Sequence, residues 1–169
     1  VTLDGDQLRF SDAELGLRED SPQRRALAGE IATRVARDGG AALVIDYGYT
    51  RRGATGDTLQ AVRRHRYAPV LDRPGEADLS AHVDFADLAA AARSAGAAVH
   101  GPVSQGAFLD ALGIAARAEI LGRKATARQR ADIALARHRL TDARAMGALF
   151  KVMGIADPRL PPPDGFGAC

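Results

Sequence analysis

The fold is decided by one short apolar run, Ala41-Ala42-Leu43-Val44-Ile45-Asp46. It follows Gly39-Gly40 directly, and Gly48 comes soon after its end. An unbroken apolar run of this length is typical of a strand buried on both faces, as in parallel sheets covered by helices. We therefore expect an α/β fold.

A helix is expected immediately before this strand. Ser21-Pro22 is a typical helix start, with serine as the cap and proline at the first helical position. Leu27, Ile31 and Val35 follow at a spacing of four residues and predict one apolar stripe. Glycines 39 and 40 end the helix and lead into the strand, as in half of a βαβ unit.

The rest of the chain shows the same mixture of short strands and helices. The stretch from Val1 to Phe10 carries an Asp-Gly turn and predicts a hairpin, and 11–20 is expected to be a loop. We expect strands at 58–67, 97–100 and 149–155, a loop at 68–83, helices at 84–94, 104–112, 114–122 and 126–139, and a flexible proline-rich tail at 158–169.

Composition limits the class of protein. Hydrophobic residues make up 46% and charged residues 26%, as in ordinary globular domains. No apolar run approaches the roughly 18 residues of a membrane helix, and the chain does not open like a signal peptide. Cys169 alone cannot form a disulfide framework. The 21 Arg against 2 Lys are typical of a GC-rich genome. With neither a signal peptide nor a disulfide framework expected, we expect a cytoplasmic bacterial protein.

Polar residues at the end of the decisive strand are candidate ligand contacts. Ligands of open α/β sheets bind outside the carboxyl ends of the strands. The stretch Asp46-Tyr47-Gly48-Tyr49 occupies that position, and Asp57 and Thr58 follow in a nearby loop. Asp46 can equally serve only to cap a turn.

The densest polar cluster lies between residues 78 and 85. Asp78, Ser80, His82 and Asp84 bring two carboxylates, a hydroxyl and an imidazole together. Their spacing is weak support for a metal site, so we expect none. Asp84 can also be a helix cap, and His82 a buried structural histidine.

Basic residues dominate the segment from 114 to 151, with nine Arg or Lys against three acids. Such a segment can meet RNA or an acidic partner. Because aromatic residues are only 5% of the chain, a base-stacking surface is hard to assemble, and a solvated helical face is favoured.

Several of these stretches together carry a family resemblance. The strings at 42–49, 56–60 and 74–85, followed by 101–109, 112–114 and 146–152, resemble the MidA-like class I methyltransferases. Mitochondrial members of that family are protein arginine methyltransferases that act in complex I assembly. The resemblance covers roughly residues 1–157.

The resemblance implies a Rossmann-like sheet of seven strands and S-adenosylmethionine as cofactor. The family's glycine-rich cofactor loop has no counterpart here. The strand at Val1 and the missing initiator Met also suggest a cut through a larger sheet. We therefore expect residues 1–157 to be the C-terminal half of the domain, with substrate-side insertions. It would be inactive without an N-terminal half that holds the cofactor, so cofactor-binding residues stay unassigned.

If the acceptor is a protein arginine, carboxylates are needed to hold its guanidinium and a base to take its proton. We expect His82 and Asp78 to be catalytic, and Asp46, Tyr47, Gly48, Asp57, Thr58 and Asp84 to bind substrate. The alternatives are a non-catalytic protein-binding or assembly module and, less favoured, a nucleic-acid-binding domain.

Overall fold

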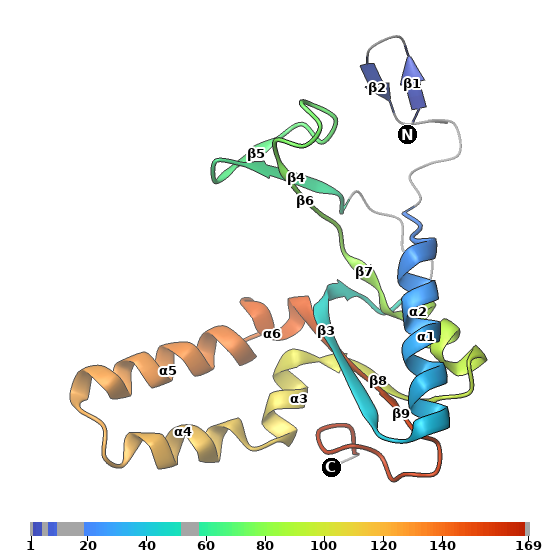
Figure 1. Ribbon diagram of the computed structural model, residues 1–169. Coiled ribbons are helices and arrows are strands. Elements are labelled where there is room, and N and C mark those ends of the chain that lie inside the picture. Colours follow the sequence, from blue (N-terminus) through green and yellow to red (C-terminus); the bar gives the residue numbers. More distant parts are fainter. Residues whose placement is uncertain (1, 5–6, 10–18, 52–57, 168–169) are drawn as a thin grey trace.

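The computed structural model describes residues 2–4, 7–9, 19–51 and 58–167. Within that part of the chain, strands and helices combine in an α/β fold (Figure 1). None of the described helices is both long and apolar enough to cross a bilayer. The Asp-Gly hairpin is confirmed: β1 (Thr2–Asp4) pairs antiparallel with β2 (Gln7–Arg9).

A four-stranded mixed sheet is the centre of the fold. Its order is β7-β3-β9-β8. The strands are β3 (Ala41–Tyr49), β7 (Val83–Asp84), β8 (Ala98–Ser104) and β9 (Phe150–Ala156). β9 runs antiparallel to both β3 and β8, and β7 pairs with β3 in parallel only at the carboxyl end of β3.

The decisive strand is a strand, but its surroundings differ from the expectation. Its main neighbour is antiparallel, and it continues past Asp46 to Tyr49. Burial on both faces was wrong, because Leu43 and Ile45 are 50% and 48% exposed. Ala42 and Val44, which alternate with them, pack against the core instead. The strand therefore has one covered and one open face in this chain.

Two helices cover the other face of the sheet. They are α1 (Pro22–Asp38) and α2 (Phe85–Ser94), and both begin as predicted, at the side-chain caps of Ser21 and Asp84. The prediction for Leu27 was wrong, because it is 57% exposed, and the alanines beside the predicted stripe are buried in its place. The core between helices and sheet includes Ala28, Ala32, Phe85, Leu88, Ala92, Met153 and Ile155.

A separate three-stranded antiparallel sheet stands away from the main sheet (Figure 1). Its strands are β4 (Gln60–Arg63), β5 (Arg66–Ala68) and β6 (Asp78–Ser80), in the order β5-β4-β6. A single strand at 58–67 was therefore the wrong expectation. The chain turns at Arg64 and His65, whose φ angles are 52° and 62°. Both values belong to the left-handed region, which a two-residue hairpin turn of this kind requires.

Helices on the opposite side of the sheet form a projecting arm (Figure 1). They are α3 (Gln105–Ala111), α4 (Ile114–Gly122), α5 (Ala127–Thr141) and the unpredicted short α6 (Met146–Leu149). Ser104 and Thr126 cap α3 and α5 as predicted. Neither α4 nor α5 contains a buried residue.

The proline-rich tail makes a contact that the sequence did not predict. The ring of Phe166 lies 5.1 Å from the ring of Phe108 and 6.2 Å from that of His100, measured between centroids. The segment after β9 therefore folds back on α3 and β8.

Candidate functional site

The carboxyl end of β3 meets the amino ends of α1 and α2. The parallel pairing of β3 with β7 joins Gly48 to Val83 and Tyr49 to Asp84, directly before α2 begins. Arg24, in the first turn of α1, donates from Nη1 to the carbonyl oxygen of His82 at 3.0 Å. This is the position at which open α/β sheets bind ligands.

Gly48 makes the close approach of β3 and β7 possible. A Cβ at this position would lie 2.3 Å from the carbonyl oxygen of Val83 and 2.9 Å from the ring of Phe85. No side chain fits there, so the absence of one is what lets the two strands pair. The structure thus gives Gly48 a packing role, and its contact with a substrate stays a prediction.

Three residues distant in sequence form a hydrogen-bonded cluster at this position. Glu19 accepts hydrogen bonds from the backbone N–H and the hydroxyl of Thr58, at 2.8 and 2.5 Å. The hydroxyl oxygen of Thr58 in turn accepts from the backbone N–H of His82 at 2.9 Å. We call Glu19, Thr58 and His82 the polar network. It fixes the entry into β4 beside the entry into β7.

Tyr47 flanks the imidazole of this network. The ring centroids of Tyr47 and His82 are 5.5 Å apart with the planes tilted by 59°, and Phe150 meets Tyr47 edge-on at 5.7 Å. Among the described residues, no hydrogen bond reaches a ring nitrogen of His82. The backbone of His82 is therefore fixed on both sides while its imidazole keeps a nitrogen for another group.

The hydroxyl of Tyr49 lies near several charges of the site. Burial raises its pKa above the usual value of 10.0. The negative charges of Asp84, Glu19 and Asp87 raise that pKa further, and the positive charge of Arg24 opposes them. Tyr49 therefore stays protonated through the neutral pH range.

Asp84 has the structural role that was left open for it. Its carboxylate accepts from the backbone N–H of Asp87 at 2.9 Å and caps α2. Asp87 is paired with Arg25 at 3.0 Å, and Arg25 also pairs with Asp20. These contacts fasten the start of α1 to the start of α2.

The other predicted carboxylates lie outside the polar network. Asp46 is inside β3, opposite Lys151, and its Oδ1 accepts from the backbone N–H of Tyr47 at 2.8 Å. Asp78 is exposed in β6, where it pairs in register with Val62. Asp57 lies outside the described residues. The structure thus brings Tyr47, Thr58 and His82 together. It places Asp84 opposite Tyr49 on β7 and Asp78 in a different sheet.

Glu19 is a site residue that sequence reasoning missed. Glu19 belongs to a stretch read as a loop, and its partner Thr58 is 39 residues away. Tyr49 belongs to the stretch named at the end of the strand, but no role was predicted for it. No local pattern connects such residues, because the contact depends on how the strands pair.

The described residues alone do not fit an S-adenosylmethionine site. Both carboxylate oxygens of Glu19 already accept from Thr58, and the carboxylate of Asp84 caps α2. The described His, Cys, Asp and Glu residues also form no group of three or more that could hold a metal ion.

Comparison with known proteins connects this geometry to a chemistry. Residues 8–103 match a family described as "Putative S-adenosyl-L-methionine-dependent methyltransferase". A Drosophila melanogaster relative named protein arginine methyltransferase NDUFAF7 homolog, mitochondrial, is 38% identical over 139 residues, which cover 81% of this chain and 31% of the fly protein. The human mitochondrial protein arginine methyltransferase NDUFAF7 is 40% identical over 103 residues, 61% of this chain and 23% of the human protein.

Two solved structures are also similar to this chain. A Burkholderia thailandensis protein bound to S-adenosyl-homocysteine superposes with a TM-score of 0.65 at 29% identity, covering 85% of this chain and 36% of that one. An uncharacterized protein from the same organism superposes with a TM-score of 0.69 at 29% identity, covering 87% of this chain and 38% of its own. The chain thus spans about a third or less of the curated relatives named above. It shares the fold of the matching part of the S-adenosyl-homocysteine-bound neighbour.

Proposed function

Because this chain belongs to the family of S-adenosyl-L-methionine-dependent methyltransferases, we propose that it forms the acceptor side of a methyltransferase active site. The observation that carries the proposal is the polar network, which holds His82 directly before β7 and beside the carboxyl end of β3. The acceptor that we propose is an arginine side chain of a protein, in line with the names of the fly and human relatives.

An arginine needs help to become a methyl acceptor. Its guanidinium is cationic at every physiological pH and is a poor nucleophile. The nitrogen that gains a methyl group must also lose a proton. His82 is the group that we propose for this proton, because its imidazole is held in place by its own backbone and meets the ring of Tyr47.

The guanidinium must be held while the proton leaves. Asp46 and Tyr47 lie near the carboxyl end of β3. We propose that they line the acceptor pocket together with Thr58 of the polar network. Exclusion of water and orientation of the two reactants would be the chain's main contribution to rate. Catalytic or binding roles for Asp57, Asp78 and Asp84 remain predictions.

S-adenosylmethionine supplies the methyl group when it is bound. In the polar network, the carboxylate of Glu19 and the hydroxyl of Thr58 are already hydrogen-bonded to each other, so neither is free to bind the amino-acid or ribose part of the cofactor. We therefore propose that the cofactor is held chiefly by a further part of the protein, equivalent to the portion of the relatives that these 169 residues do not span.

The open face of β3 is where we propose that this further part packs. Leu43 and Ile45 are about half exposed there, and the edge of β3 is paired with β7 only from Gly48 onward. An apolar pair on a central strand is costly to leave in water. Neighbouring strands and helices from the same domain would bury it.

A protein-binding or assembly module without catalysis is the second candidate. It is favoured by the internal satisfaction of Glu19 and Asp84, which is what a purely structural network needs. Calorimetry separates the two: S-adenosyl-homocysteine is titrated into the protein in the full length that its gene encodes. Saturable one-to-one binding is expected, and absence of binding would overturn the methyltransferase proposal. A cytoplasmic location and a link to respiratory complex assembly stay predictions.

A further inference from the structure

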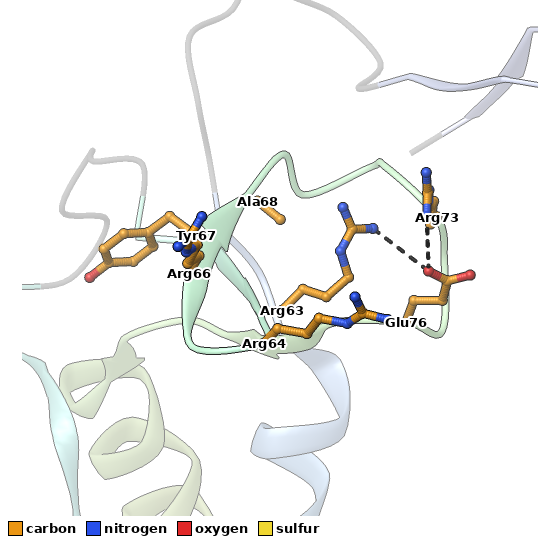
Figure 2. A pocket seen from close by; sticks show the side chains of 7 residues that line it. All are labelled: Arg63, Arg64, Arg66, Tyr67, Ala68, Arg73 and Glu76. Carbon is orange, nitrogen blue, oxygen red and sulfur yellow. Dashed lines mark ion pairs between the residues drawn. The ribbon is translucent and has the colours of Figure 1, made fainter.

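The three-stranded sheet carries an arginine-rich pocket that the polar network does not include. The pocket has a volume of about 820 Å³. Four arginines line it together with one carboxylate and an exposed tyrosine (Figure 2): Arg63, Arg64, Arg66, Arg73, Glu76 and Tyr67. We call this the arginine pocket.

The carboxylates of the pocket leave it positively charged. Arg63 and Arg73 both reach Oε2 of Glu76 at 3.7 Å (Figure 2). Arg63 also meets Asp72 at 3.3 Å. Within the described part of the chain, Arg64 and Arg66 have no ion-pair partner. The Nη1 atom of Arg63, which faces Glu76 at 3.7 Å, is buried and makes no hydrogen bond to the described residues. The pocket thus offers unused donors and two exposed guanidinium groups.

The backbone of the hairpin turn presents these groups at its tip. Arg64 and His65 take positive φ angles, a conformation that asparagine or glycine adopts more easily. Bulky side chains at such positions cost stability, so a hairpin that keeps Arg64 there is not optimised for the turn alone.

We propose that the arginine pocket binds an acidic segment of the protein that is methylated. Arginine guanidinium groups bind carboxylates through paired, charge-assisted hydrogen bonds. The inference rests on the proposed function, because it names a feature of the same substrate. β4 follows Thr58 and β6 leads to His82, so the three-stranded sheet that carries the pocket begins at the polar network.

A nucleic acid fits this pocket less well than an acidic peptide. Tyr67, 80% exposed, is the one aromatic ring that lines the pocket, and base stacking needs several such platforms. Asp72 and Glu76 beside the arginines would also repel a continuous polyanion. A short acidic segment can place its carboxylates on Arg64 and Arg66, which have no ion-pair partner among the described residues.

Fluorescence anisotropy with a labelled peptide of alternating aspartate and glutamate tests the inference on the gene-encoded protein. The variant is Arg64→Asn with Arg66→Gln, which removes both charges and suits the positive φ at position 64. Its matched control is Arg128→Gln with Arg137→Gln, two exposed arginines of α5. We expect at least about a tenfold weaker Kd for the pocket variant, and less than about a twofold change for the control.

Equal peptide affinity in the wild type and the pocket variant would overturn the inference. A second result would also overturn it: the wild type binds a single-stranded RNA more tightly than the peptide, and the pocket variant no longer binds that RNA. This result would assign the pocket to nucleic acid. Because the peptide assay needs no cofactor and no methyl transfer, its failure leaves the proposed function standing. If the wild-type protein binds the peptide but does not bind S-adenosyl-homocysteine, the proposed function is contradicted and the inference about the pocket is not.

Discussion

The hydroxyl oxygen of Thr58 lies 2.5 Å from Oε2 of Glu19 and accepts the backbone N–H of His82 from its other side. Thr58, just before β4, thus links the stretch before α1 to His82, the residue directly before β7. His82 owes its fixed position to this bridge and to the bond from Arg24.

Loss of the Glu19 carboxylate is expected to loosen the bridge. Glu19→Gln replaces a charge-assisted bond to the Thr58 hydroxyl with a neutral one, and we expect about 1–2 kcal/mol lower free energy of unfolding. Urea denaturation measures it. Glu119→Gln, on an exposed i,i+4 pair of α4, is the control and should cost less than about 0.5 kcal/mol. Equal costs for the two variants would argue against the bridge.

A methyl group at Gly48 is expected to separate β3 from β7. Its Cβ would meet the carbonyl oxygen of Val83 at 2.3 Å, so Gly48→Ala should lower stability by about 3 kcal/mol. Gly29→Ala is the matched control, since nothing lies within 4 Å of that position in α1. It should raise stability by about 0.5–1 kcal/mol, because alanine is the better helix former. Chemical denaturation of both variants gives the comparison, and a neutral Gly48→Ala would contradict the strand pairing.

The raised pKa of Tyr49 predicts a pH effect on stability. The folded state keeps its proton above the usual value of 10.0, whereas the unfolded chain loses it there. Stability from this group is therefore complete below that pH and is lost as pH rises through the folded pKa. Tyr49→Phe should flatten this alkaline loss, and Tyr67→Phe, on an exposed ring, should not. Thermal unfolding across alkaline pH distinguishes them, and parallel curves for Tyr49→Phe and the wild type would disprove the shift.

The open face of β3 predicts a hidden interface in the gene-encoded protein. If further parts of the domain cover it, Leu43→Ser should cost about 1.5–3 kcal/mol of unfolding free energy there. Leu135→Ser, on the projecting helix α5 and 67% exposed, should cost less than about 0.5 kcal/mol. A similarly small cost for both substitutions would show that water still covers Leu43.

Local chemistry made part of this fold predictable. The caps at Ser21, Asp84, Ser104 and Thr126 were found from sequence because each acts within three residues of itself. The hairpin at Arg64 was missed because neither turn residue is glycine or asparagine. The antiparallel partner of β3 lies more than 100 residues away, so no pattern near Leu43 could indicate it.

Part of the candidate site could also be predicted from the sequence. The candidates Tyr47, Thr58 and His82 do meet, since all three lie near strand ends, where α/β folds gather polar groups. Asp78 was grouped with His82 by sequence proximity, but β6 carries it into the other sheet. Glu19 could not be foreseen, because its hydrogen bonds depend on the tertiary arrangement.

Methyl transfer by a His82 variant tests the central claim most directly. The gene-encoded protein, its His82→Gln variant and the control His138→Gln, an exposed histidine of α5, are each given S-adenosylmethionine and extract from cells that lack the gene. Mass spectrometry then measures methylarginine in the extract proteins. We predict that His82→Gln lowers the rate by about 100-fold or more, with S-adenosyl-homocysteine affinity unchanged and the control fully active. Wild-type levels of methylarginine with His82→Gln would contradict the account.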